Sequence, residues 1–147
     1  MRILVDADAC PGRNIIEKAA KENSLEVILF CDLNHVLNST YSTVKYVDSG
    51  FQSVDMVVAN EAKKGDIVIS QDYGVAAMSL GKSAFAISPK GYIYDNSNMD
   101  RLLFERHIAQ KVRRSGGRTT GTNKKRSSED DERLYRNLIK LIKSSKE

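Results

Sequence analysis

The sequence predicts an α/β protein with a mainly parallel central sheet, covered by helices on both faces, and a C-terminal helical extension. Short apolar runs rich in β-branched residues alternate along the chain with segments whose apolar residues recur at helical spacing. The connections between most of these segments are short, which is typical of βαβ units and of the parallel strands that they join. A last amphipathic segment after a polar stretch predicts the extension.

The expected strands are brief and almost continuously apolar, which is typical of strands buried on both faces of a parallel sheet. The run from Ile3 to Val5 is too short for a helix, and Cys10-Pro11-Gly12 follows it as a break. The strands are expected over residues 2–6, 25–31, 43–47, 66–70 and 83–87, with a small edge strand or hairpin arm over 91–94. Residues 32–42 show neither period and predict a long loop.

Helices are expected where apolar residues share one face. They are expected from just after Gly12 to about Asn23, over 53–64, over 75–80, over 96–114 and from Ser128 onwards. Gly65 fits a C-terminal cap of the second helix. Three acidic residues after Ser128 are typical of a helix start, because they oppose the positive end of the helix dipole. The apolar stripe of this last helix must dock on the rest of the protein, and it consists of Leu134, Leu138, Leu141 and Ile142.

A chain of 147 residues, 41% of them hydrophobic, can bury a core without disulfides or a structural zinc. The composition excludes collagen-like, fully disordered and disulfide-framework proteins. We expect an α/β domain over residues 1–114, a basic flexible linker over 115–128 and a C-terminal helix over 129–147.

The longest apolar runs are far shorter than the roughly 20 residues that a membrane span needs. The first residues lack the features of a signal peptide, and the two cysteines form no C-x-x-C motif. We therefore expect a cytoplasmic protein without a membrane partner. The sequence leaves the oligomeric state open.

Acidic residues follow several of the expected strands, at the edge where open parallel sheets bind ligands. They are Asp6, Asp8, Asp48, Asp55 and Asp72. Asp6 ends the first strand, Asp55 lies in the first turn of a helix, and Asp72 follows the fourth strand. Because strand ends and the following helix starts meet at one edge, these carboxylates are expected to converge. Asp66 begins its strand and belongs on the opposite edge.

Converging carboxylates repel one another, and a hard divalent cation such as Mg²⁺ or Mn²⁺ removes that repulsion while gaining oxygen ligands. Taken singly, Asp8 and Asp55 are also explained as helix-entry acids, and Asp48 as a turn residue. The expectation of a metal site depends on Asp6, Asp55 and Asp72 together, because they come from three separate elements.

Four motifs, in order over about residues 1–120, resemble the YaiI/YqxD family of small bacterial proteins, whose function is uncharacterised. They are V-D-A-D-A-C-P from Val5, G-F-Q-S-V-D from Gly50, G-D-I-V-I-S-Q-D from Gly65 and S-G-G-R-T from Ser115. After Thr120 the chain is more basic than the family pattern.

This resemblance implies a PIN-like nuclease fold, a three-layer sandwich related to NYN domains. In such a fold one Asp ends the first strand, another opens a central helix and a third ends the following strand. Those positions are Asp6, Asp55 and Asp72, and Asp8 is the candidate for the fourth acid that PIN-like nucleases commonly add. The implied ligands of Mg²⁺ or Mn²⁺ are therefore Asp6, Asp8, Asp55 and Asp72.

Positive charge gathers towards the C-terminus. Residues 1–100 hold 9 Lys and Arg against 13 Asp and Glu, whereas residues 101–147 hold 14 against 6. Such an asymmetry favours a polyanionic partner, with a solvated linker as the alternative. The candidate nucleic-acid contacts are Lys111, Arg113, Arg114, Arg118, Lys124, Lys125 and Arg126. The candidate base-stacking residues are Tyr41, Tyr46, Phe51 and Tyr73.

The leading hypothesis is a metal-dependent ribonuclease, in which Asp6, Asp55 and Asp72 are catalytic and a metal-activated water hydrolyses the phosphodiester. A non-catalytic nucleic-acid or nucleotide-binding module is a second hypothesis. A third is a phosphatase-like hydrolase with Asp6 as a covalent nucleophile, because an apolar strand followed by Asp-x-Asp also suits an aspartyl-phosphate mechanism.

Overall fold

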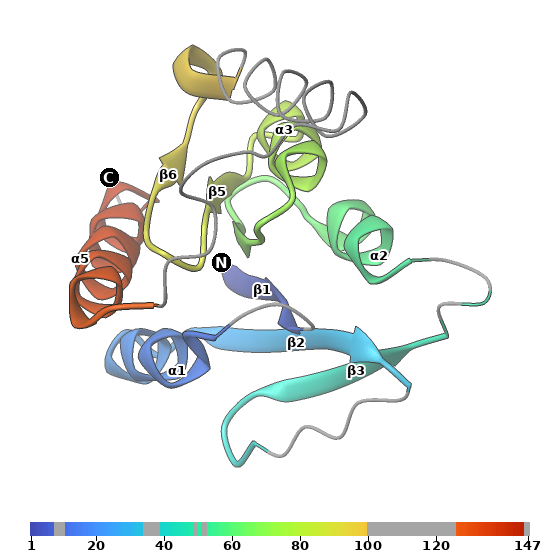
Figure 1. The fold of residues 1–147 in the computed structure, drawn as a ribbon, viewed down its shortest axis with the longest axis horizontal. Coiled ribbons are helices and arrows are strands. Elements are labelled where there is room, and N and C mark those ends of the chain that lie inside the picture. The colour runs from blue at the N-terminus through green and yellow to red at the C-terminus, as the bar shows by residue number, and fades with distance from the viewer. Residues whose placement is uncertain (8–10, 34–38, 49, 51–52, 100–125, 146–147) are drawn as a thin grey trace, which may run out of the picture.

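One mainly parallel sheet organises the computed structural model, which describes residues 1–7, 11–33, 39–48, 50, 53–99 and 126–145. Within these residues the sheet has six strands in the order β3-β2-β1-β4-β5-β6 (Figure 1). They are β1 (Arg2–Asp6), β2 (Glu26–Asp32), β3 (Thr43–Val47), β4 (Ile67–Ile69), β5 (Phe85–Ile87) and β6 (Ile93–Tyr94). The last strand, β6, is antiparallel to β5, and the other neighbours are parallel.

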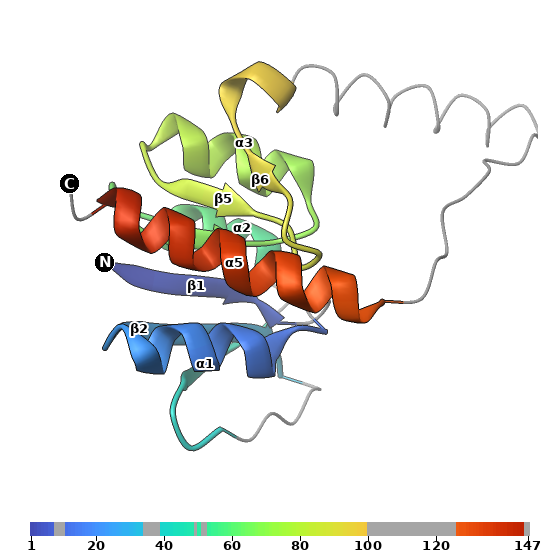
Figure 2. The ribbon, with the colours of Figure 1, turned by 90° about the vertical axis from the view of Figure 1, so that its left-hand side faces the viewer.

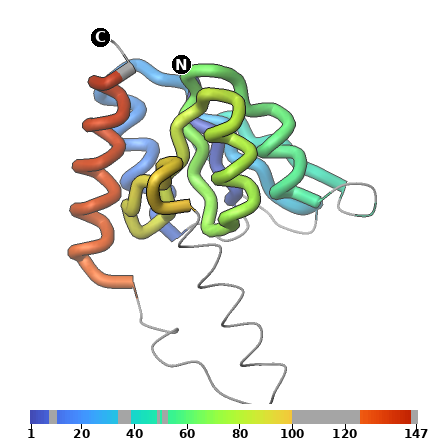
Figure 3. The backbone as a smooth tube through the Cα atoms, turned by 90° about the horizontal axis from the view of Figure 1, so that it is seen from above, coloured from blue at the N-terminus to red at the C-terminus, as the bar shows by residue number. Residues whose placement is uncertain are grey.

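Helices cover both faces of the sheet, which confirms the predicted fold class (Figure 3). The described helices are α1 (Arg13–Glu22), α2 (Val54–Glu61), α3 (Tyr73–Gly81) and α5 (Ser128–Ser145). Side chains alternate between the two faces along β1: Ile3 and Val5 enter the core under α1 and α5, whereas Leu4 enters the core under α2 and α3. Residues 96–99 are helical too, and the rest of the helix expected over 96–114 lies outside the described residues.

The C-terminal helix completes the core on one face of the sheet. Leu134, Leu138 and Ile142 of α5 are fully buried in the same cluster as Ile3 and Val5 of β1. Figure 2 shows α5 beside α1, from which it is separated by more than a hundred residues of chain. The expected docking of the apolar stripe is therefore confirmed. The boundary expected at residue 114 falls outside the described residues and stays a prediction.

Two helix ends differ from the prediction. The second helix, α2, ends at Glu61, and Gly65 is not its cap; it occupies a turn before β4 with φ of +87°. The turn is held by Asp66, whose carboxylate accepts a hydrogen bond from the Lys63 N–H at 3.0 Å. The C-terminal carbonyls of α2 are bound instead by the ammonium of Lys82, which donates to Ala59 O at 2.6 Å.

The third helix, α3, begins at Tyr73, two residues before the predicted start, because Asp72 caps it. The helices in the described ranges include none with the length and apolar composition that a bilayer crossing requires.

Candidate active site at the carboxyl edge of the sheet

The strand order reverses between β1 and β4. From β1 the chain passes through α1 to β2 on one side, whereas β4 lies on the other side and is followed by α3 on the opposite face. Val5 pairs with Ile69 in parallel register, so Asp6 and Ser70 leave the sheet side by side. In open α/β sheets the crevice at such a reversal is where ligands bind. The topology therefore singles out the place where the acidic residues were expected.

Asp6 is the last residue of β1 and is half-buried. The residues on both sides of it, Val5 and Ala7, are buried in the core that α1 and α5 cover. Parallel pairing places Asp6 opposite Phe30 of β2. Its backbone is thus held beside β2, just past the last residue of β1 that pairs with β4, and it lies at the carboxyl edge of the sheet.

Asp72 lies at the same edge and is fixed by local hydrogen bonds. Its Oδ1 accepts from the Val75 N–H at 3.0 Å, which caps α3, and its own N–H donates to Ser70 Oγ at 3.0 Å. The capping role was the ordinary explanation of a single acid at a helix start. Here it does not exclude a ligand role, because a carboxylate has about four acceptor positions.

Asp55 reaches this edge from the helix layer. It lies in the first turn of α2, where its Oδ1 accepts from the Met56 N–H at 3.0 Å. The helix packs by Val54 and Val58 on the face that contains Leu4. Since α2 connects the carboxyl end of β3 to the start of β4, its first turn lies at the carboxyl edge. Asp55 and Asp6 therefore share an edge but come from different layers.

The opposite edge has its own acid, as predicted. Asp66 lies at the start of β4, is 4% exposed, and forms an ion pair with Arg2 at 2.8 Å. The backbone N–H groups of Arg2 and Lys63 donate to the same carboxylate, at 3.2 and 3.0 Å. This carboxylate accepts three hydrogen bonds, from Arg2 of β1 and from the turn before β4, and it lies at the edge away from the other acids, so it is not a candidate ligand.

The three catalytic candidates thus share one edge, but they do not form a ready-made metal site. In the described part of the chain, no group of three or more His, Cys, Asp or Glu side chains is arranged to hold a metal ion. Asp8, the implied fourth ligand, lies outside the described residues. Asp48 follows β3 and is exposed, and its Oδ1 accepts from the Gly50 N–H at 3.0 Å, as expected for a turn residue.

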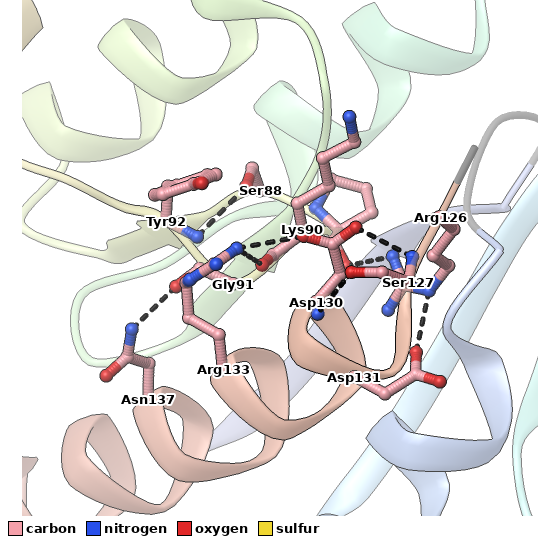
Figure 4. A network of polar contacts seen from close by, with 11 residues as sticks. Ser88, Lys90, Gly91, Tyr92, Arg126, Ser127, Asp130, Asp131, Arg133 and Asn137 are labelled. Carbon is pink, nitrogen blue, oxygen red and sulfur yellow. Dashed lines mark hydrogen bonds and ion pairs between the residues drawn. The ribbon is translucent and has the colours of Figure 1, made fainter. Parts of the chain in front are cut away.

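Most of the basic candidates lie outside the described residues. They are Lys111, Arg113, Arg114, Arg118, Lys124 and Lys125. Arg126 is described, and it joins α5 to the turn between β5 and β6 (Figure 4). Its Nε pairs with Asp131 at 2.7 Å and its Nη1 donates to Pro89 O at 2.6 Å. Its Nη2 is buried and has no hydrogen-bond acceptor among the described residues.

A pocket of about 640 Å³ adjoins the acidic edge. Gln71 and Tyr73, on either side of Asp72 in the chain, line it together with the β5–β6 turn and Arg126. Of the predicted stacking residues only Tyr73 is in this lining; Tyr46 is 47% exposed elsewhere, and Phe51 lies outside the described residues. The sequence reasoning missed Tyr92 and Tyr94, and their i, i+2 spacing within the edge strand expected over 91–94 was the available signal.

The chain matches a known family over nearly its whole length. The model of the uncharacterised YaiI/YqxD family matches residues 4–144, so the match extends past Thr120 into the last helix. A UPF0178 protein of Clostridium tetani is 70% identical over 146 residues and is covered, like this chain, to 99%. A UPF0178 protein of Clostridium novyi is 68% identical over 147 residues, covering 100% of this chain and 98% of its own.

A solved structure also aligns with the chain. It is Rae1 (YacP) from Bacillus subtilis, crystallised as a point mutant, and it is 18% identical with a TM-score of 0.44. The alignment covers 98% of this chain and 99% of that one.

Proposed function

Because the chain belongs to the YaiI/YqxD family, whose function is uncharacterised, we propose a function from the chain's own residues: metal-dependent hydrolysis of phosphodiester bonds in RNA. The observation that supports it is that Asp6, Asp55 and Asp72, from three separate elements, lie at the edge of the sheet where the strand order reverses. Ordinary helix-start contacts explain Asp55 and Asp72 singly, but they do not explain why three separate elements bring acids to one edge of the sheet.

The donor chemistry of this edge fits a hard divalent cation. The three groups are carboxylates, which Mg²⁺ and Mn²⁺ prefer over nitrogen or sulfur ligands. Asp6, Asp55 and Asp72 would hold the ion, with Asp8 as the further candidate. Since no such group is preassembled in the described residues, binding requires the carboxylates to move closer together. A bound ion supplies a Lewis acid for the phosphodiester and a source of hydroxide near neutral pH.

The protein's own part is to keep these carboxylates in place. Asp72 is oriented by the Val75 N–H and Asp6 by its position between buried neighbours on β1. Such fixed acids repel a phosphate chain, so a polyanionic substrate also needs cations nearby. The basic residues between 111 and 126 are proposed to supply them, and their phosphate contacts would carry no sequence information.

A second candidate function is a nucleic-acid or nucleotide-binding module without catalysis. The observation that favours it is the lack of a preassembled acidic group in the part of the chain that the structure describes. On this alternative the edge acids have only local structural roles, and the protein binds RNA without cutting it.

An RNA cleavage assay separates the two. The parent, Asp6→Asn and Asp48→Asn are purified identically and incubated with a labelled single-stranded RNA and Mn²⁺. We expect the parent and Asp48→Asn to cut the RNA, because Asp48 is an exposed turn residue with the same charge at the same edge. Asp6→Asn should lose at least about a hundredfold in rate. Equal cleavage by all three would show contamination or another site, and binding without cleavage by the parent would favour the module.

A further inference from the structure

The pocket beside Asp72 has a chemical character different from that of the acidic edge. Its lining comes from the residues that follow β4 and β5, from the start of α3, from β6 and α5, and from Pro11 before α1. Its volume of about 640 Å³ is in the range of small-molecule sites. Its described lining includes two cations, Lys90 and Arg126, and three tyrosines, but no Asp or Glu. A ligand that suits this lining has an aromatic ring and a negative charge.

Contacts within the protein hold the aromatic rings of the pocket in place. Tyr73 and Tyr94 meet edge to face, with ring centroids 5.8 Å apart and an interplanar angle of 71°. Tyr94 is 5% exposed, its hydroxyl donates to Ser70 O, and burial raises its pKa, so the phenol stays neutral. The guanidinium carbon of Arg133 lies over the ring of Tyr92, 4.3 Å from the ring centroid. Rings fixed in this way stack on a base with little loss of side-chain entropy.

Arg126 lines another part of the pocket and gives it a positive charge that suits an anion. Two of the three guanidinium nitrogens of Arg126 are satisfied by Asp131 and by Pro89 O, and Nη2 is buried without an acceptor among the described residues. A buried donor without a partner destabilises the fold. Because Nη2 is buried, an anionic oxygen in the pocket would satisfy it once the guanidinium turns towards the ligand.

The surroundings of Nη2 strengthen this need. A Cβ added to Gly12, the N-cap residue of α1, would lie 2.6 Å from Nη2, so the guanidinium sits against the start of that helix. Pro11, directly before Gly12, lines the pocket. The N-terminal end of a helix is itself positive, and the two positive groups side by side favour a bound oxyanion.

Together these features lead us to propose that the pocket binds one nucleotide, with its base against the tyrosines and its phosphate on Arg126. The position next to Asp72 makes it the nucleotide adjacent to the bond that the acidic edge would cut, and this placement on a substrate strand rests on the proposed function. Nucleotide binding itself needs no metal, because the pocket lining contains no carboxylate among the described residues.

Calorimetric titration in EDTA tests the phosphate assignment. The probes are adenosine 5′-monophosphate and adenosine, titrated into the full chain. The parent should bind the monophosphate roughly tenfold more tightly than the nucleoside. Arg126→Gln should lose that preference, with weaker binding of the monophosphate and unchanged binding of adenosine. Lys143→Gln, an exposed change of the same charge on α5, should behave as the parent. No binding of the monophosphate by the parent, or a parent-like preference for the monophosphate in Arg126→Gln, would overturn the proposal.

A second variant keeps the test decisive if Arg126→Gln disturbs the docking of α5. Tyr73→Leu removes a stacking ring and should weaken both probes by about tenfold while leaving the preference for the phosphate. Parent-like affinity for adenosine in Tyr73→Leu would contradict the base assignment.

Competition separates this inference from the proposed function. In EDTA, where no metal-dependent cleavage can occur, a short single-stranded oligoadenylate should displace the monophosphate from the parent. Failure to displace it would overturn the placement on a substrate strand. Loss of cleavage in Asp6→Asn with intact monophosphate binding would bear on the acidic edge alone.

Discussion

Gly91 of the β5–β6 turn lies directly against the backbone of Leu134 in α5: a Cβ at Gly91 would be 2.4 Å from the Leu134 nitrogen. Around this approach, Asn137 donates to Gly91 O at 2.6 Å and Arg133 donates to Lys90 O at 3.1 Å (Figure 4). The helix thus binds the carbonyls of the turn that lines the pocket. Only glycine fits here, both for space and for its φ of +92°.

We therefore predict that Gly91→Ala lowers the free energy of unfolding by roughly 3 kcal/mol or more, because α5 must shift away from the sheet. Gly65→Ala is the matched control. Gly65 has a similar φ of +87°, but nothing lies within 4 Å of an added Cβ. Its cost should be only the backbone strain, about 1 kcal/mol. Urea unfolding of the two variants measures the difference, and equal losses would mean that the close approach does not stabilise the docked helix.

Neutralising the acid at either end of the β1–β4 strand pair, Asp6 or Asp66, should change the stability of the protein in opposite directions. Asp6→Asn relieves repulsion among the edge acids, so its melting temperature without metal should equal or exceed that of the parent. It should lose the Mn²⁺ stabilisation, which is about 2.7 kcal/mol at a hundredfold excess of metal over the dissociation constant. Asp66→Asn breaks the pair with Arg2 and should cost roughly 1–3 kcal/mol while keeping the Mn²⁺ shift.

Thermal melts of the parent and of both variants, each with and without Mn²⁺, measure these changes. Equal Mn²⁺ shifts in Asp6→Asn and the parent would exclude Asp6 as a ligand.

Features of the fold and of the candidate site that depend on neighbouring residues in the sequence could be predicted from it. Val27 to Cys31 form an unbroken apolar run and are all buried in β2, because a strand covered on both faces needs apolar residues at every position. The sequence also predicted at which edge of the sheet each acid lies. A residue at or just after the end of a parallel strand lies at the carboxyl edge, as Asp6 and Asp72 do.

What the sequence could not show depended on distant partners. No local pattern marks the order of the strands, because β1 and β4, which lie side by side, are far apart in the sequence. Glycine is a common helix cap, which is why Gly65 was predicted to cap α2. In the structure the carboxylate of Asp66 accepts a hydrogen bond from the Lys63 N–H, and Gly65 lies in the turn that this bond stabilises. The pocket is assembled from segments between Pro11 and Asn137, so no single motif marks it.

The docking of α5 should weaken in acid. The pKa of Asp130 lies below its ordinary value of 3.8, because the Ser127 N–H donates to its carboxylate and the Arg133 guanidinium pairs with it. A depressed folded pKa gives stability that is present above the unfolded pKa and is lost as the pH falls through the folded pKa. Urea unfolding at stepped pH from about 5 to about 2.5 should show this loss in the parent and a shallower pH dependence in Asp130→Asn. Parallel pH curves for both proteins would contradict this role of Asp130.

If the basic residues between 111 and 126 contact RNA phosphates, RNA binding should weaken as the salt concentration rises. Each phosphate contact on a single strand contributes roughly −0.7 to the slope of log affinity against log salt. Replacing Arg113, Arg114 and Arg118 by Ala should therefore flatten the slope by roughly 2 while leaving the Mn²⁺ shift unchanged. Filter binding across a salt series measures it. A parent-like affinity and slope in the triple variant would make the segment a solvated linker.

The central claim is that Asp6, Asp55 and Asp72 share one divalent cation, and an anomalous difference map from a crystal soaked in Mn²⁺ tests it most directly. The account predicts one strong peak at the carboxyl edge, within bonding distance of carboxylate oxygens from β1, from the first turn of α2 and from the start of α3. A saturating soak that leaves this edge without a peak, or a peak coordinated by none of the three carboxylates, would contradict it.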